Sequence, residues 1–223
     1  VKTLSHRGPD GSAIFNCGKA VLAHTRLAII DLKSGCQPMA SADRKNIIVF
    51  NGEIFNYKSL KQELICSGYS FSTNSDTEVV LNAYRHFGEG CLKHFHGMFA
   101  FAIYDLEKKC LFAARDRYGL KPFYYAHYNG LFIFGSEARA FYEAGLVPFE
   151  PKSEHFNEFL IFGYVAGSQT LHKHIYELQP GHYLTYEDSG INTFQYYDYG
   201  ISVKDSFSSR EESDVIAELE NRI

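Results

Sequence analysis

A short polar segment directly follows an apolar segment near residue 50, and its residue types could do chemistry. Ile47 to Phe50 are apolar, and Asn51, Gly52 and Glu53 follow them without a break. A side-chain amide and an unobstructed glycine N–H are hydrogen-bond donors, and two such donors that converge on one point form an oxyanion hole for acyl transfer. Asn-Gly is also a strong signal for a tight turn, so the residues alone leave both interpretations open.

Three charged residues could bind the two ends of a free amino acid. Arg26 lies between two apolar stretches, where a buried guanidinium is costly unless it binds a carboxylate. Glu53 and Asp76 lie at the ends of predicted elements, where a carboxylate could bind an ammonium group. Together with two oxyanion donors, these charges describe a pocket for an α-amino acid with a reactive side-chain carbonyl. Taken singly, each residue is more often part of a surface ion pair.

Hydrophobic periodicity predicts the elements that must position these residues. Apolar residues at helical spacing predict helices over 57–67 and 76–87, the second capped by Ser75 or Asp76 and followed by Gly88. Asn129-Gly130 is the strongest turn signal. Strands are predicted at 21–23, 27–31, 47–50, 97–105, 110–116, 123–127, 131–135, 183–186 and 193–197, and shorter helices at 137–144 and 153–162.

This order of elements predicts an α+β fold. Strands in meander order, with helices between groups of them, differ from the regular βαβ alternation of a parallel sheet. The polar, serine-rich segment 201–210 predicts a linker at about 200 to 210. Helical spacing returns in 210–223, which we expect to be the first helix of a further domain.

The composition argues against several classes of partner. The 223 residues are 45% hydrophobic and 22% charged, as in an ordinary globular protein, and the net charge of −4 favours neither nucleic acid nor an anionic membrane. No apolar run approaches the ~20 residues of a membrane-spanning helix. Five scattered cysteines without a C-x-x-C pair favour reduced thiols in the cytoplasm over disulfides or a zinc site.

Two other kinds of site fit the sequence less well. The H-x-H pairs at 94–96 and 172–174 lack acidic residues at a ligand spacing, so exposed or hydrogen-bonded imidazoles explain them better than a metal site. The tyrosine-rich segment 118–199 could stack on sugars, but aromatic residues at strand spacing are more often core residues or cross-strand pairs. We therefore expect no metal site and no carbohydrate-binding surface.

Eight motifs occur in one order along the chain. They are SHRGPDGSAIF (5–15), AHTRLAIIDL (23–32), QPM (37–39), NGEIFNY (51–57), SDTEVVLNAY (75–84), GMFAFAIYD (97–105), ARDRYGLKPFYY (114–125) and GSEARA (135–140). The series resembles the glutaminase domain of glutamine-dependent asparagine synthetases, class II glutamine amidotransferases of the N-terminal-nucleophile hydrolase superfamily. The resemblance covers the chain to about residue 200. It implies a four-layer αββα sandwich of two antiparallel sheets.

The resemblance implies where the backbone ends of a glutamine substrate bind. Arg26 matches the arginine that binds the α-carboxylate, and Ile29 and Ile30 line the same site through their backbone. Arg7 matches an arginine near the same pocket.

The remaining matches concern the α-ammonium and the reacting carbonyl. Glu53 and Asp76 match the groups that hold the α-ammonium of glutamine. Asn51 and Gly52 match the oxyanion donors, which gives them the catalytic role in this segment. These matches agree with the interpretation of the same groups from their chemistry.

In the resembled family, the nucleophile is the thiol of a cysteine that becomes the first residue after Met removal, and its own α-amine is the base. This chain begins at Val1, so we expect residues 1–200 to be a glutaminase domain that lacks this N-terminal segment. None of the five internal cysteines has a free amine. We therefore expect the 223-residue chain alone to be inactive.

The resembled family passes ammonia to a second domain that uses ATP to amidate aspartate. Its SGGxDS-type pyrophosphate loop does not occur here, so 201–223 is expected to be a linker and the first helix of a missing synthetase domain. We expect ATP and Mg in that domain in cis and no cofactor in this one; a homodimer is compatible with the resemblance. The alternatives are a related amidotransferase for a sugar or another carboxylate, and a non-catalytic glutamine-binding remnant.

Overall fold

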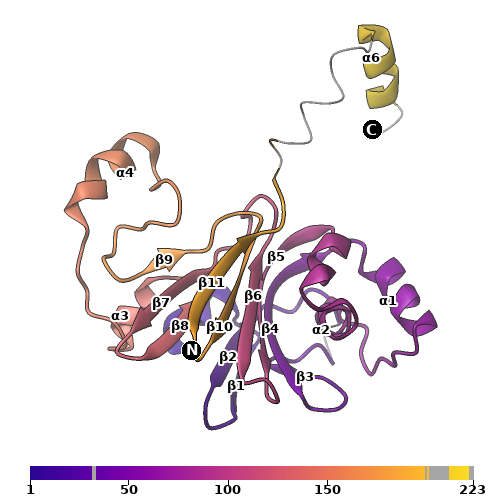
Figure 1. The fold of residues 1–223 in the computed structure, drawn as a ribbon, viewed down its shortest axis with the longest axis horizontal. Helices are drawn as coiled ribbons and strands as arrows, with labels where there is room; N and C mark the ends of the chain where they lie inside the picture. Colours follow the sequence, from indigo (N-terminus) through magenta and orange to yellow (C-terminus); the bar gives the residue numbers. More distant parts are fainter. Residues whose placement is uncertain (32–33, 199, 201–210, 221–223) are drawn as a thin grey trace.

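A six-stranded antiparallel sheet forms the centre of the molecule (Figure 1). The computed structural model describes residues 1–31, 34–198, 200 and 211–220, without the side chains of 215 and 219. The strand order is β11-β10-β6-β5-β4-β3. These strands are β3 (Met39–Ala40), β4 (Asn46–Ile54), β5 (Gly97–Asp105), β6 (Cys110–Arg115), β10 (His182–Glu187) and β11 (Gly190–Gln195).

Two helices cover one face of this sheet. They are α1 (Tyr57–Cys66) and α2 (Asp76–Phe87), close to the predicted 57–67 and 76–87. Ser75 caps α2 by accepting the N–H of Thr77. Apolar side chains of both helices and of the 3-10 helix Gly88–His94 form one core with alternate residues of the sheet, including Ile48 and Phe50.

Two smaller sheets cover the other face. One pairs β1 (Gly11–Asn16) with β2 (Val21–Arg26), and the other has the order β8-β7-β9, with β7 (Tyr124–Tyr128), β8 (Leu131–Gly135) and β9 (Tyr176–Glu177). Their apolar residues share a second core with the opposite alternate residues of the central sheet, including Ile47 and Val49. Behind them, Phe141 of α3 (Arg139–Glu143) packs on β7. The αββα layers are confirmed, although the second β layer consists of two separately bonded sheets.

The strand β4 decides between the two interpretations of Asn51-Gly52. Residues 47–50 are buried on both faces, as their continuous apolar character predicts. The strand does not turn there: it runs on to Ile54, with Asn51 opposite Ala100 and Gly52 opposite Phe99 of β5. The tight-turn interpretation is therefore wrong, and the polar triplet is part of a central strand.

Other elements differ from the predictions at their ends. The strand expected at 27–31 is wrong: β2 ends at Arg26, and the following loop is held by side chains instead of a strand partner. At the N-terminus, β1 and the 3-10 helix Lys2–Arg7 were not predicted: the helix has few apolar residues, and those of β1 are consecutive instead of alternating. The short strands β3 and β9 and the 3-10 helix Gly88–His94 were not predicted either. Of 153–162, Ser153–His155 is a 3-10 helix and Phe156–Phe162 is α4.

The helix α4 carries an unusual number of exposed apolar side chains. None of its residues is buried, and Leu160, Ile161 and Phe162 are 79%, 73% and 63% exposed. Near the C-terminus, α6 (Glu212–Glu220) is the helix expected in 210–223, whereas the predicted linker 201–210 lies outside the described residues. Within the described residues, no helix combines the length and the apolar character that a bilayer crossing requires.

Candidate active site

The open edge of β4 carries the two predicted oxyanion donors. β3 pairs with β4 only at Ile47 and Ile48, so the rest of this edge has no strand partner among the described residues. Side chains replace the strand at two points: Gln37 Oε1 accepts the N–H of Phe50 at 2.6 Å, and Asp76 Oδ2 accepts that of Ile54 at 3.1 Å. Because backbone directions alternate along a strand, the N–H of Gly52 faces the same edge, between these two bonds.

Glycine is required at position 52 by the close approach of β5. A Cβ added to Gly52 would lie 2.1 Å from the carbonyl oxygen of Met98, and its φ of +154° is one that side chains rarely adopt. The backbone N–H of this residue is therefore unobstructed by a side chain of its own. This agrees with a role in which the backbone binds a ligand atom.

The Asn51 side chain has an unsatisfied donor. Within the described residues, its Nδ2 atom is buried and has no hydrogen-bond partner. A buried unpaired amide costs roughly 1–3 kcal/mol, so such groups usually have a function or a ligand. With Gly52 N–H on the adjacent residue, Asn51 can supply the second donor of an oxyanion hole.

Two carboxylates lie together at the end of β4. Asp76, the first residue of α2, is 4% exposed, and Glu53 is half-buried beside Ile54, the partner of Asp76. Burial raises the pKa of Asp76 above its ordinary value, and the Glu53 carboxylate adds to this increase although backbone N–H groups oppose it. Negative charge concentrated in this way favours a bound cation such as an ammonium group.

Arg26 is held at the end of β2 by the first sequence motif. Gly8 lies so close to the backbone of Thr25 that a Cβ would be 2.3 Å from its carbonyl carbon. The N–H of Asp10 donates to the Arg26 carbonyl at 3.0 Å, and the Asp10 carboxylate accepts the N–H of Ala28 at 2.8 Å. The residues HRGPD thus fix the backbone on both sides of Arg26.

The Arg26 side chain lies against the loop that contains the two isoleucines. Its guanidinium donates to the backbone carbonyl of Asp31 at 2.6 Å, and the Asp31 carboxylate accepts the N–H of Asn74 at 2.8 Å. Asn74 is two residues before Asp76, so these bonds connect Arg26 to the start of α2. In this loop Ile29 is 66% exposed and Ile30 is half-buried.

Two residues at the site were missed by sequence reasoning. His24 Nε2 lies 3.1 Å from the Phe50 carbonyl oxygen, and within the described residues its buried Nδ1 has no partner. Burial and the nearby Arg26 lower the pKa of His24. Gln37, the other residue, bonds both backbone groups of Phe50. The available signal was that His24 and Gln37 both lie within motifs of the series, AHTRLAIIDL and QPM.

Arg7 occupies an ion-pair cluster. Its guanidinium lies 3.2 Å from the carboxylate of Glu137, which also binds His6 at 2.8 Å and Arg139 at 2.7 Å. These contacts join the 3-10 helix at the N-terminus to the residues just before α3. They connect motifs HRGPD and GSEARA, which are about 130 residues apart in sequence.

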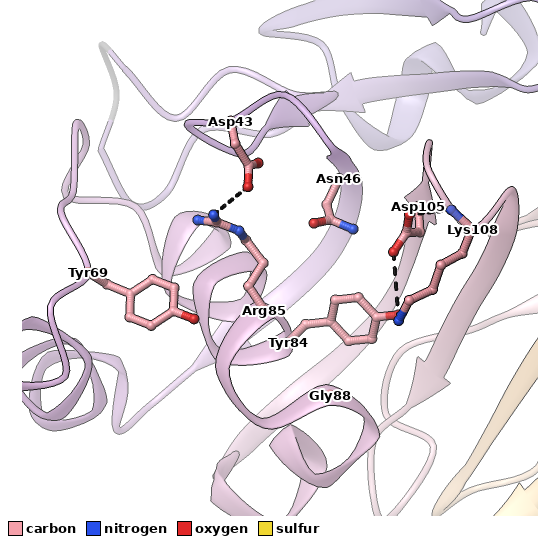
Figure 2. A pocket seen from close by; sticks show the side chains of 8 residues that line it. All are labelled: Asp43, Asn46, Tyr69, Tyr84, Arg85, Gly88, Asp105 and Lys108. Carbon is pink, nitrogen blue, oxygen red and sulfur yellow. Dashed lines mark hydrogen bonds and ion pairs between the residues drawn. The ribbon is translucent and has the colours of Figure 1, made fainter.

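A polar pocket of about 300 Å³ lies at the opposite end of β4 (Figure 2). Two ion pairs border it, Asp43 with Arg85 at 2.6 Å and Asp105 with Lys108 at 4.0 Å. It contains none of the predicted site residues. Because its charges already neutralise each other, we regard the open edge of β4 as the candidate active site. The pocket lining is Asp43, Asn46, Tyr69, Tyr84, Arg85, Gly88, Asp105 and Lys108.

Comparison with known proteins identifies the family. The family model described as "Glutamine amidotransferase domain" matches residues 1–197. The chain belongs to the glutamine amidotransferase domain family.

Three relatives of this glutamine amidotransferase domain are informative. "Asparagine synthetase [glutamine-hydrolyzing] 3" of Bacillus subtilis is 39% identical over 201 residues, which is 87% of this chain and 32% of the relative. "Asparagine synthetase B [glutamine-hydrolyzing]" of Escherichia coli is 40% identical over 141 residues, 62% of this chain and 25% of the relative. "Amidase chyE" of Penicillium rubens is 32% identical over 99% of this chain and 32% of the relative. The chain thus spans about a third or less of these relatives.

Solved structures support the fold of the glutamine amidotransferase domain. Glutamine phosphoribosylpyrophosphate amidotransferase from Bacillus subtilis aligns with a TM-score of 0.63 at 22% identity, over 88% of this chain and 45% of that one. A structure described as the allosteric regulatory enzyme of purine biosynthesis aligns with a TM-score of 0.59 at 23% identity, over 79% of this chain and 35% of that one. At these identities the likeness concerns the fold alone.

Proposed function

We propose that this chain is the glutaminase part of an asparagine synthetase. It binds L-glutamine and provides the oxyanion hole for hydrolysis of the side-chain amide, in which water displaces ammonia and leaves glutamate. A second domain then uses the ammonia for the ATP-dependent amidation of aspartate. The observation that carries this proposal is the 39% identity, over 87% of this chain, to a relative named for glutamine hydrolysis and asparagine synthesis.

The site residues fit glutamine group by group. Arg26 receives the α-carboxylate, with the backbone of Ile29 and Ile30 beside it. Asp76 and Glu53, whose mutual repulsion contributes to the raised pKa of Asp76, receive the α-ammonium. The side-chain carbonyl then lies at the edge of β4.

At that edge, Asn51 Nδ2 and Gly52 N–H bind the carbonyl oxygen as negative charge develops on it. Removing one donor of an oxyanion hole typically lowers kcat by ~10²–10³. The unsatisfied Asn51 amide supports this role because the substrate would supply the missing acceptor.

None of the five cysteines is proposed as the nucleophile. Cys91 is fully buried, and burial raises its pKa and that of Cys110, which disfavours the reactive thiolate. The Cys17 thiol donates to the carbonyl of Ala20, and Cys66 ends α1. The Cys36 thiol lies 4.0 Å from the Arg26 guanidinium, which places it at the α-carboxylate end of the proposed ligand and not at the side-chain carbonyl.

The relatives' greater length supports a second domain. An exposed surface of apolar residues usually marks an interaction site, and α4 presents Leu160, Ile161 and Phe162. No observation favours a sugar or another carboxylate as the acceptor.

Isothermal titration of the 223-residue chain with L-glutamine tests the proposal. We expect saturable binding that is lost in Arg26→Ala and weakened at least tenfold in Arg26→Lys, which keeps the charge without the planar guanidinium. Arg44→Ala, an exposed arginine in the turn before β4, is the matched control and should bind normally. Absence of binding by the unmodified chain would contradict the proposed function.

A further inference from the structure

The side chain of Gln37 continues the pattern of β3 where the strand itself stops. Met39 of β3 pairs with Ile48, so the same register places Gln37 opposite Phe50. The Gln37 amide replaces the backbone: Oε1 accepts the N–H of Phe50 at 2.6 Å, and Nε2 donates to the Phe50 carbonyl at 3.1 Å.

The same amide also reaches α2. Gln37 Nε2 lies 3.3 Å from Thr77 Oγ1, and Thr77 follows Asp76. One side chain therefore contacts the residue before Asn51 and the residue after Asp76. Gln37 thus connects the part of β4 that carries the oxyanion donors to the start of α2, which carries Asp76. The bond from Ile54 N–H to Asp76 is a second connection between the same two elements.

These bonds also determine which N–H groups on the edge of β4 are available. The N–H of Phe50 is bound by Gln37 and that of Ile54 by Asp76. Among the described residues, the Gly52 N–H between them has no hydrogen-bond partner, so it can serve a ligand.

We propose that Gln37 is a positioning residue for the oxyanion hole. By binding both backbone groups of Phe50, it fixes the plane of the next peptide and hence the direction of the Asn51 and Gly52 donors. It also prevents the Phe50 N–H from binding the substrate carbonyl in a displaced position. This inference rests on the proposed function, because it assigns the ligand carbonyl to these donors.

The test compares two ligands in Gln37→Leu, which keeps the approximate size but makes none of the three bonds. L-Glutamine has the side-chain amide, whereas L-norvaline has the same α-amino and α-carboxylate groups and no carbonyl in its side chain. We expect the preference for L-glutamine over L-norvaline, measured by isothermal titration, to fall about tenfold. Gln195→Leu, on the exposed surface of β11, is the matched control and should keep the preference of the unmodified chain.

A spectroscopic measurement separates positioning from a purely structural role. The backbone amide resonance of Gly52 should shift on addition of L-glutamine in the unmodified chain and in Gln195→Leu, and not in Gln37→Leu. An equal loss of affinity for both ligands, or a lower unfolding temperature with the preference unchanged, would overturn the inference. If Gln37→Leu does not fold, Gln37→Glu is used, which keeps an acceptor for Phe50 N–H and should shift the preference in the same direction by a smaller factor.

Failure of this inference differs from failure of the proposed function. If the unmodified chain binds no L-glutamine, the proposed function is wrong and Gln37 has no oxyanion hole to position. If the unmodified chain and Gln37→Leu prefer L-glutamine equally, the function stands and the inference is wrong.

Discussion

The Asp76 carboxylate accepts the backbone N–H of Ile54 at 3.1 Å, and this bond holds the start of α2 against the end of β4. As a result, Asp76 lies beside Glu53, and the two acids repel each other in a poorly hydrated position. Such an arrangement destabilises the folded chain unless a cation binds. We interpret it as the ammonium site of an amino-acid ligand.

Replacing Asp76 by Asn should stabilise the protein and weaken binding. The folded-state pKa of Asp76 is raised, so its favourable contribution to stability is present below about pH 3.8 and is lost as the pH rises through the folded value. At pH 7 the substitution removes a buried charge and keeps an acceptor for Ile54. We expect the melting temperature to rise by about 2–4 °C and the Kd for L-glutamine to increase at least tenfold, roughly 1.4 kcal/mol.

Asp188→Asn, in the exposed turn between β10 and β11, is the control for that experiment and should change neither quantity. If Asp76→Asn bound L-glutamine as tightly as the unmodified chain, Asp76 would not be an ammonium ligand.

The affinity for L-glutamine should depend on pH through the same group. Only ionised Asp76 attracts the ammonium, and its pKa in the free protein lies above 3.8, so affinity should increase as the pH rises above that value and then level off. Titrations at several pH values measure this dependence. The increase should be much smaller in Asp76→Asn, and an equal increase in both proteins would assign the dependence to another group.

Substitution of Gly52 should damage the fold itself. In Gly52→Ala the new Cβ meets the Met98 carbonyl in a backbone conformation that alanine rarely adopts, and we expect a loss of roughly 3 kcal/mol in the free energy of unfolding. Gly68→Ala is the matched control, since its φ of +92° is also positive but nothing lies within 4 Å. Urea denaturation should show a clearly smaller loss for Gly68→Ala. Equal losses would mean that the close approach of β5 has no special cost.

Asn51→Ala should affect ligand binding more than stability. Within the described residues the Asn51 amide donor has no partner, so its removal takes away an unfavourable buried group. We expect an unchanged or slightly higher melting temperature, at least tenfold weaker binding of L-glutamine and normal binding of L-norvaline. A marked drop in melting temperature with unchanged binding would show that Asn51 supports the fold and not the ligand.

Much of the fold was predictable because its core elements have strong periodicity. Residues 76–87 and 97–105 were predicted to the residue, since a capping serine and a long apolar run mark their ends. The prediction of a strand at 27–31 was wrong because side chains bind the backbone of this segment. The Arg26 guanidinium donates to the Asp31 carbonyl, and the Asp10 carboxylate accepts the N–H of Ala28, so these groups are not available to a sheet. Periodicity contains no information about such long-range competition.

The candidate site was predictable in its residue types but not in its supporting bonds. Arg26, Asn51 and Asp76 could be proposed from their chemistry and from the resemblance of the motifs. The role of Gln37 depends on a register between β3 and β4 that no local pattern specifies. The role of His24 depends on how closely β2 packs on β4, because its imidazole must reach the Phe50 carbonyl. Both residues act on the backbone of Phe50, an apolar residue that attracts no attention in a search for functional groups.

A crystal structure of the chain with L-glutamine tests the central claim most directly. The account predicts the α-carboxylate against Arg26, the ammonium against Asp76 and the side-chain oxygen within about 3 Å of Asn51 Nδ2 and Gly52 N. Glutamine bound instead between Arg85 and Lys108 in the polar pocket of Figure 2, or with its amide directed away from the edge of β4, would contradict it.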